Sequence, residues 1–546
     1  MKLFDFPKSG RLRKAVLGLI ACLSLAGNAQ ANDLPDLGES ARAELSPQME
    51  RRIGENIMNE IRLREPGYVD DPEINDYLER LGRRLVEASA NPGGEFHFFA
   101  IRDNTVNAFA MFGGYIGVNT GTLLAAQSES ELAGVLAHEI AHVTQNHLAR
   151  QIAKEKQNTL PSLIAMAVGL LAARSNTSVA AGVMASAQAG MIQAQLAYSR
   201  DFEREADRMG YQTLEKAGFD VHGMSDFFER LQKASRLYEN NAPVYFRSHP
   251  LTVERRSDMQ NRAQNSPYRQ VVSSLDFHLV RARLRAQAML PKDAVAEFKR
   301  LLREKKYSSE TAARYGLAYA LLRAHDVKGA GAALVGARGD SPILAGLAAS
   351  IRKQSGDLAG AREIYRQALP RFPQARSLAY AYVESLHAAG SYSQALAFLD
   401  ERLSYDPSDY LLFGWQAKVY ASLGKRVQQR RAQAEYYLLQ GRIGAAIEQL
   451  QLAQQEKEGD FYELSAVDAR LRELRKRQRE EEESKGKNGG AHANLHYSAV
   501  SNSVYMDMSH IKSICSRTEL RVPFPRRTGV GSTAFTRTEA GRARRS

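Results

Sequence analysis

Two histidines and a glutamate lie within five residues in the segment His138-Glu139-Ile140-Ala141-His142. Residues four apart on a helix stack one turn above the other, so both imidazoles can bind one metal ion. Glu139 can then take a proton from a water molecule at the open position of that ion. The spacing therefore predicts a zinc hydrolase site with one Zn²⁺ per chain.

The segment around this motif has the pattern of a buried helix. Apolar residues recur at helical spacing between Ser130 and Gln151, and neither proline nor glycine follows Gly134. Ser130 is the predicted N-cap. We therefore expect one regular helix to present the motif.

Two histidines leave a zinc ion short of a protein ligand. The metzincin spacing would place a histidine at position 148, which is Leu148, so that class is excluded. His147 is one residue out of step and is expected to point to another face of the helix. We interpret it as a packing residue or as a partner of a ligand.

A better candidate for the third ligand is Glu203, in a second predicted helix. Asp207 lies one turn later on the same face and can accept the free N–H of a ligand histidine, which fixes its tautomer. Glu205 lies around the helix from Glu203 and is expected to face solvent. Alone, this acidic cluster would more often be a solvated helix face, and only the zinc motif favours a site.

Together with residues 107–114, whose sequence is NAFAMFGG, these motifs resemble the M48 family of zinc metallopeptidases. The resemblance covers about residues 35–480. It implies that His138, His142 and Glu203 bind zinc, and that the neighbour of His138 in the motif is the general base. The fold it implies is an α+β, zincin-like domain, mainly helical with a small sheet.

The resemblance also assigns roles outside the two helices. The strand near Phe109 would pair with an extended substrate, because main-chain hydrogen bonds hold a peptide independently of its sequence. His249, in a Ser-His-Pro element, would fill the open metal position when substrate is absent or would stabilise the oxyanion. A histidine packed in a loop is the plain alternative.

The N-terminal residues 1–31 have the pattern of an export signal. Basic residues precede an apolar run and a small-residue cleavage site that ends at Ala31. Lipid attachment at Cys22 is the alternative. Since Cys515 is the other cysteine of the chain, the mature protein can form no internal disulfide.

The net charge of +13 is concentrated at the two ends of the chain. The signal contributes +4 and residues 485–546 contribute +8, which leaves +1 for the body. A nearly neutral body gives no electrostatic reason to expect nucleic acid. The basic tail at 485–546 shows no periodicity, and we interpret it as disordered.

The sequence divides into two folded regions. Residues 32–270 are predicted to form the peptidase domain, with a strand region at 96–102 and 107–118 that is broken by Gly113-Gly114. Two apolar stretches, 163–173 and 179–197, are interpreted as a buried or lid-like helical hairpin, with contact to a membrane surface as the alternative.

The second region, residues 275–484, is predicted to be an all-α solenoid. Gly356, Gly390 and Gly424 recur every 34 residues, each at the junction of two amphipathic helices. This period is typical of tetratricopeptide repeats. Weaker units before and after these glycines bring the expected number to four or five.

The functional hypothesis is an exported zinc endopeptidase whose repeats recruit its clients. The resemblance implies a periplasmic location, unfolded or misassembled outer-membrane β-barrel proteins as clients, and the β-barrel assembly machinery as partner. The main alternative is a periplasmic chaperone or adaptor whose zinc site is mostly closed. A purely structural zinc site gains nothing from Glu139 and is the weakest of the three readings.

Overall fold

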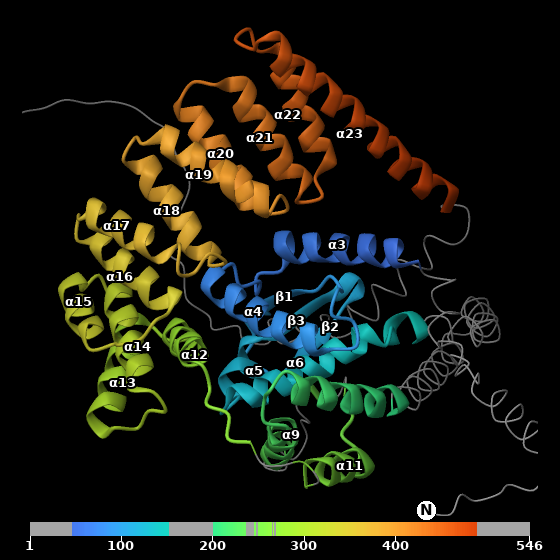
Figure 1. Ribbon diagram of the computed structural model, residues 1–546, viewed down its shortest axis with the longest axis vertical. Coiled ribbons are helices and arrows are strands. Elements are labelled where there is room, and N and C mark those ends of the chain that lie inside the picture. Colours follow the sequence, from blue (N-terminus) through green and yellow to red (C-terminus); the bar gives the residue numbers. More distant parts are fainter. Residues whose placement is uncertain are drawn as a thin grey trace, which may run out of the picture. The chain divides into compact units, whose positions relative to one another are not determined.

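The computed structural model describes residues 46–151, 200–235, 245–246, 249–264, 266 and 269–488 (Figure 1). The predicted export signal with Cys22, both apolar stretches, and the tail beyond residue 488 with Cys515 lie outside these residues. In the described ranges, no helix combines the length and hydropathy that a bilayer span requires.

The N-terminal region, up to residue 264, is a small sheet surrounded by helices. Its elements are α3 (Pro47–Arg64), α4 (Pro72–Ala88), β1 (His97–Ile101), β2 (Ala108–Ala110), η2 (Phe112–Gly114), β3 (Tyr115–Asn119), α5 (Thr120–Ala125), α6 (Glu129–Thr144), an unlabelled helix over 200–216, α9 (His222–Ser235) and α11 (Val253–Gln264).

The sheet of the described region has the strand order β1-β3-β2. β1 runs parallel to β3, and β2 runs antiparallel to it, so β2 is an edge strand. The turn into β3 requires glycine at position 114, where φ is +77° and a Cβ atom would lie 2.0 Å from the Glu95 carbonyl oxygen. β1 lies within the first predicted strand segment, 96–102, whereas the second, 107–118, forms two strands, β2 and β3, on either side of the turn at Gly113-Gly114.

Alternation of side chains along the strands gives the sheet two buried faces. Phe98 and Ala100 of β1 face the main core, to which α4, α6 and α9 contribute. Phe99 and Ile101 face a second cluster, closed by α3. In Figure 1 the sheet accordingly lies between α3 and α6.

The helix that carries the motif, α6, differs from the prediction at both ends. Ser128, not Ser130, is its N-cap, and the Ser128 hydroxyl accepts a hydrogen bond from the Glu131 N–H at 3.2 Å. The helix ends at Thr144, because Asn146 adopts a left-handed conformation with φ of 52°. A new helical segment begins at residue 147.

The helix over residues 200–216 packs closely on α6. Gly210 permits this contact, since a Cβ atom there would lie only 3.1 Å from the His138 Cα atom. The glycine therefore brings the acidic residues of this helix close to the histidines of α6.

The C-terminal region consists of consecutive antiparallel helix pairs. Its helices are α12 (Leu275–Gln287), α13 (Pro291–Glu304), α14 (Glu310–Arg323), α15 (Val327–Val335), α16 (Pro342–Gln354), α17 (Leu358–Ala368), α18 (Arg376–Ala388), α19 (Tyr392–Tyr405), α20 (Tyr410–Ser422), α21 (Arg426–Leu438), α22 (Ile443–Gln455) and α23 (Phe461–Asn488). The chain divides into two compact units within α23, after Val467.

The 34-residue period marks the turns inside the helix pairs. Gly356, Gly390 and Gly424 follow α16, α18 and α20, and each has a positive φ, of 89°, 68° and 73°. Glycine adopts this conformation without strain and so ends the first helix of a pair. The predicted fold class, an α+β domain followed by helical repeats, is confirmed.

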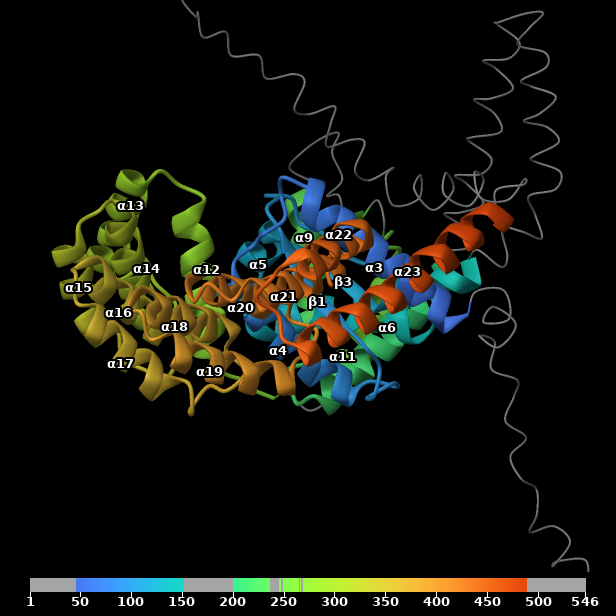
Figure 2. The same cartoon turned by 90° about the horizontal axis from the view of Figure 1, so that it is seen from above.

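Ion pairs join the N-terminal part of α4 to α12 and α18, each of which is the first helix of a helix pair. The Arg283 guanidinium of α12 lies 2.7 Å from both Asp71 Oδ2 and Glu73 Oε2. Arg376 of α18 lies 2.7 Å from Asp76 Oδ1. Figures 1 and 2 both show α12 between the other repeat helices and the N-terminal region. We call this contact the α4 junction.

Candidate metal centre

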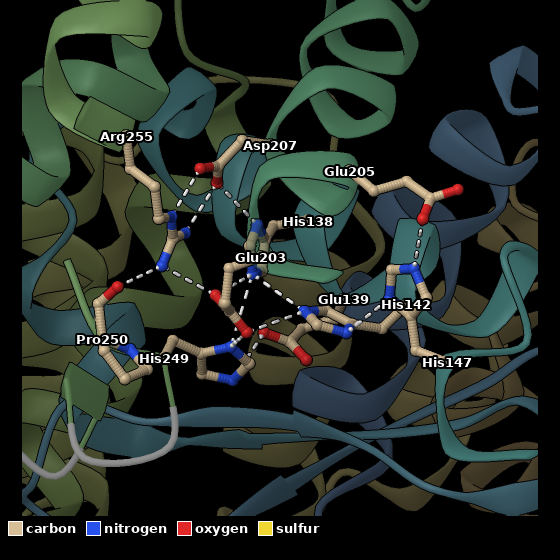
Figure 3. A network of polar contacts seen from close by, with 10 residues as sticks. All are labelled: His138, Glu139, His142, His147, Glu203, Glu205, Asp207, His249, Pro250 and Arg255. Carbon is tan, nitrogen blue, oxygen red and sulfur yellow. Dashed lines mark hydrogen bonds and ion pairs between the residues drawn. The ribbon is translucent and has the colours of Figure 1, made fainter. Parts of the chain in front are cut away.

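α6 presents the first two candidate ligands on one face (Figure 3). The Nε2 atoms of His138 and His142 lie 3.1 Å apart. The side chain of His138 is fully buried, whereas that of His142 keeps 14% exposure. The site is therefore anchored in the core at one histidine and open at the other.

Glu203 and His249 meet these histidines from two other elements. The Glu203 oxygens lie 3.4 Å from the Nε2 atoms of His138 and His142. His249 Nδ1 lies 3.0 Å from Glu203 Oε1 and 3.4 Å from His138 Nε2. The four ligand atoms all fall within 4.8 Å of one another.

These separations suit a tetrahedral metal ion. Nitrogen and oxygen ligands bound tetrahedrally to zinc stand about 3.3–3.6 Å apart, as follows from bond lengths of roughly 2.0–2.2 Å. The separations of 3.0–3.4 Å are close to this value. The side chains of His138, His142 and Glu203 could therefore hold one metal ion with little rearrangement.

Glu139 lies beside this cluster and is only 1% exposed. Its Oε1 atom lies 3.5 Å from His249 Nε2 and has no hydrogen-bond partner among the described residues. A buried carboxylate oxygen without a partner costs free energy unless a ligand of the site satisfies it. The geometry thus leaves Glu139 able to accept a proton within the site.

Behind the candidate ligands, Asp207 and Arg255 form a buried ion pair. Asp207 Oδ1 lies 3.1 Å from His138 Nδ1. The Arg255 guanidinium donates to both Asp207 oxygens at 2.6 and 2.8 Å and to the Pro250 carbonyl at 2.7 Å. It also lies 2.8 Å from Glu203 Oε2. Arg255 thereby connects the acidic helix to the loop that carries His249.

The charges of the site favour anionic carboxylates. Burial raises the pKa of Glu203, but His249 and Arg255 outweigh it and hold that pKa well below its usual value. The pKa of Asp207 is likewise lowered against burial, by Arg255. Burial opposes protonation of His138, yet Asp207 and Glu203 raise its pKa to about 10. The carboxylates thus supply the negative charge that a cation requires.

On the outer side of the site, the position of Glu205 differs from the expected one. Glu205 does not simply face solvent: its side chain is 24% exposed and lies 3.3 Å from His147 Nε2 and 3.0 Å from Arg150. His147 is 3% exposed, and its Nδ1 lies 3.0 Å from His142 Nδ1. Burial, with His142 and Arg150, lowers the pKa of His147 to about 2, so it is neutral.

Arg255 was not among the site residues predicted from the sequence. It is followed by Arg256 in a polar helix, where such residues are usually solvated, and nothing in the spacing separates one from the other. The one available signal is its position five residues after Pro250, near the start of the helix that follows the Ser-His-Pro element.

An apolar recess lies beside His142. It has a volume of about 30 Å³ and is lined by the turn after β2, with Met111 and Phe112, and by Val143 and Leu148. The recess therefore joins the edge of the sheet to the open side of the candidate metal centre.

Comparison with known proteins agrees with this geometry. The profile of Peptidase family M48 matches residues 72–263, and a tetratricopeptide-repeat profile matches residues 353–417. The beta-barrel assembly-enhancing protease of Escherichia coli strain K12 is 31% identical over 486 residues, which cover 85% of this chain and 97% of that protein.

Two further relatives match over shorter segments. A Vibrio cholerae protein, also named a beta-barrel assembly-enhancing protease, is 41% identical over 49% of this chain, and the match spans 54% of that protein. The metalloprotease YcaL of E. coli strain K12 is 29% identical over 35% of this chain and 73% of that protein. From the long match to the E. coli protein, the profiles and the fold, we conclude that the chain belongs to peptidase family M48 and is a metallopeptidase with C-terminal tetratricopeptide repeats.

Proposed function

We propose that the protein is a zinc-dependent endopeptidase of the periplasm. In this proposal residues 1–31 are the export signal, 32–270 the peptidase domain, 275–484 the repeats and 485–546 a basic tail. The observation that carries the proposal is the cluster of four ligand atoms beside the buried carboxylate of Glu139.

In the proposed reaction, His138, His142 and Glu203 would hold the zinc ion. A bound zinc ion supplies Lewis acidity, which activates water and polarises a peptide carbonyl. Glu139 takes the proton of the attacking water and delivers it to the leaving amine, so no covalent enzyme intermediate is needed. Because Glu139 is buried, bulk water does not compete for this proton.

Asp207 is proposed to orient the first ligand. Its carboxylate lies 3.1 Å from His138 Nδ1, so it keeps the hydrogen on that nitrogen and leaves the lone pair of Nε2 for the metal. The fork from Arg255 fixes the Asp207 carboxylate in turn.

His249 favours a second candidate function, that of a chaperone or adaptor with a mostly closed site. Its Nδ1 atom stands where a fourth ligand would, 3.4 Å from His138 Nε2. A histidine bound there would block water, and its withdrawal would open the site and allow it to stabilise the oxyanion. The two functions differ in how often this withdrawal occurs.

The proposed substrates are unfolded or misassembled outer-membrane β-barrel proteins. The names of the E. coli and V. cholerae relatives support this class. β2 is an edge strand next to the metal centre, and exposed strands of a misassembled barrel can pair with such an edge. The repeats are proposed to recruit these clients or the assembly machinery.

The test combines metal analysis with proteolysis of the mature, full chain. We expect about one zinc ion per chain, and casein cleavage that a chelator abolishes and zinc restores. Glu139→Gln should retain zinc and lose cleavage by a factor of at least ~10³. The matched control is Glu297→Gln on α13, which should cleave at the wild-type rate.

The same variant separates the two candidate functions. Full rescue of envelope integrity by Glu139→Gln in cells that lack the protein would favour the adaptor. Cleavage by purified Glu139→Gln at the wild-type rate would overturn the catalytic assignment itself.

A further inference from the structure

The two histidines of the metal motif differ in what stands behind them. His138 is contacted directly by the Asp207 carboxylate at 3.1 Å. His142 instead meets another imidazole, with His147 Nδ1 3.0 Å from its own Nδ1. The carboxylate on this side, Glu205, lies one step further out.

The end of α6 creates this arrangement. Asn146 adopts a left-handed φ of 52°, and its N–H donates to the Val143 carbonyl at 3.0 Å, which closes the helix. The chain then starts a new helix at residue 147. A continuous helix would carry His147 away from His142, so the reversal is what brings the two rings together.

The surroundings of His147 hold its ring in one orientation. The ring stacks on Phe202, with centroids 4.3 Å apart and planes 16° apart. Arg150 lies over the same Phe202 ring at 4.6 Å and donates to Glu205 Oε2 at 3.0 Å. His147 is therefore fixed by stacking on one side and by Glu205, 3.3 Å from its Nε2, on the other.

The hydrogen positions follow from the contacts. Nε2 of His142 faces the metal cluster, so its lone pair serves a metal only if the hydrogen is on Nδ1. His147 Nδ1 must then accept, which puts the hydrogen of this ring on Nε2, facing Glu205. Only this pair of tautomers gives each contact one donor and one acceptor.

We infer that His147 and Glu205 form a two-step positioning relay that fixes the tautomer of His142 and so raises its affinity for the metal. The inference rests on the proposed role of His142 as a zinc ligand. His147 and Glu205 are positioning residues, since neither side chain belongs to the cluster of candidate ligands. Partners of this kind typically contribute a factor of about 10–100 to metal affinity.

The test measures the zinc dissociation constant of the mature, full chain by competition with a chromogenic chelator. His147→Phe keeps the aromatic stack on Phe202 and removes both nitrogens. It should weaken zinc binding about 10- to 100-fold. Glu205→Leu should weaken it less, and Glu205→Gln, whose amide oxygen still accepts from Nε2, should restore most of the loss.

The control is Asp201→Asn, which changes an exposed carboxylate on the same helix and should leave the zinc dissociation constant unchanged. In the double variant His147→Phe/Glu205→Leu, the loss of zinc affinity should equal that of His147→Phe alone, because Glu205 acts on His142 only through His147. Imidazole ¹⁵N shifts of the wild-type chain should place hydrogen on Nδ1 of His142 and on Nε2 of His147.

The failures of the two proposals are distinguishable. A wild-type chain that binds no zinc contradicts the proposed function. A wild-type chain that binds zinc, with His147→Phe binding it equally tightly or with the two losses simply adding, overturns the relay alone. If His147→Phe does not fold, the Glu205 pair and the ¹⁵N shifts decide the question.

Discussion

Two places in the molecule set a pair of carboxylates that are close together in the sequence against one arginine. In the candidate metal centre, Glu203 and Asp207 share Arg255. There His249 and Arg255 overcome burial, and the pKa of Glu203 lies well below its usual value. The carboxylates of the metal centre are thus held in the anionic form that a cation needs.

The α4 junction gives the opposite result. Asp71 and Glu73 share Arg283, and burial, with the further negative charges of Asp71 and Asp76, raises the pKa of Glu73 to about 7. The difference teaches that the number of cations per carboxylate, not burial alone, decides the ionisation. The metal centre adds histidines to its arginine, whereas the junction adds more carboxylates.

The largest expected effect comes from removing the arginine of the metal centre. Arg255→Met leaves Glu203 and Asp207 buried without their guanidinium, which should cost about 3–5 kcal/mol of unfolding free energy. Urea unfolding measures the loss, and Arg255→Lys should recover part of it because it keeps the charge without the fork. A change below ~1 kcal/mol in Arg255→Met would contradict the charge balance described for the site.

A smaller and pH-dependent effect is expected at the junction. Arg283→Met should destabilise the protein by about 2–3 kcal/mol at pH 8, where Glu73 is anionic. At pH 5.5 the loss should be smaller, because Glu73 can take up a proton instead. Equal losses at the two pH values would mean that Glu73 is ionised at both.

The smallest effect isolates Glu73 itself. Its folded-state pKa, about 7, exceeds the ordinary value of 4.5, so its contribution to stability is complete below pH 4.5 and is lost as the pH rises through 7. The difference in unfolding free energy between Glu73→Gln and wild type should therefore shift by about 1–3 kcal/mol in favour of the variant as the pH rises from 5 to 8. Urea unfolding at both pH values checks this, with exposed Glu87→Gln on α4 as the flat control.

Much of the fold and the inner site could be predicted from spacing. The 34-residue glycine period predicted the repeats, and the four-residue spacings at 138–142 and 203–207 predicted which side chains share a helix face. Such periodicities are local properties of the chain. They hold wherever the helix is regular, which is why these predictions could be made without tertiary information.

The rest depended on where regular structure ends. The helix cap was misjudged by two residues because Ser128 and Ser130 both precede acidic residues in the same pattern. The solvated position expected for Glu205 was wrong because the left-handed turn at Asn146 brings Arg150 and a histidine over it. A single backbone conformation of this kind leaves no periodic trace in the sequence.

The shortness of β2 has a consequence for the proposed pairing of this strand with a substrate. Three residues, 108–110, offer few main-chain hydrogen bonds, each worth about 0.5–1.5 kcal/mol net, so a free peptide would leave this edge quickly. If the repeats grip another part of the same polypeptide, the tether raises the effective concentration of the cleavable segment to about the millimolar range. The distance between the segment bound by the repeats and the cleavage site, rather than tight binding at the cleavage site, then selects the bond that is hydrolysed.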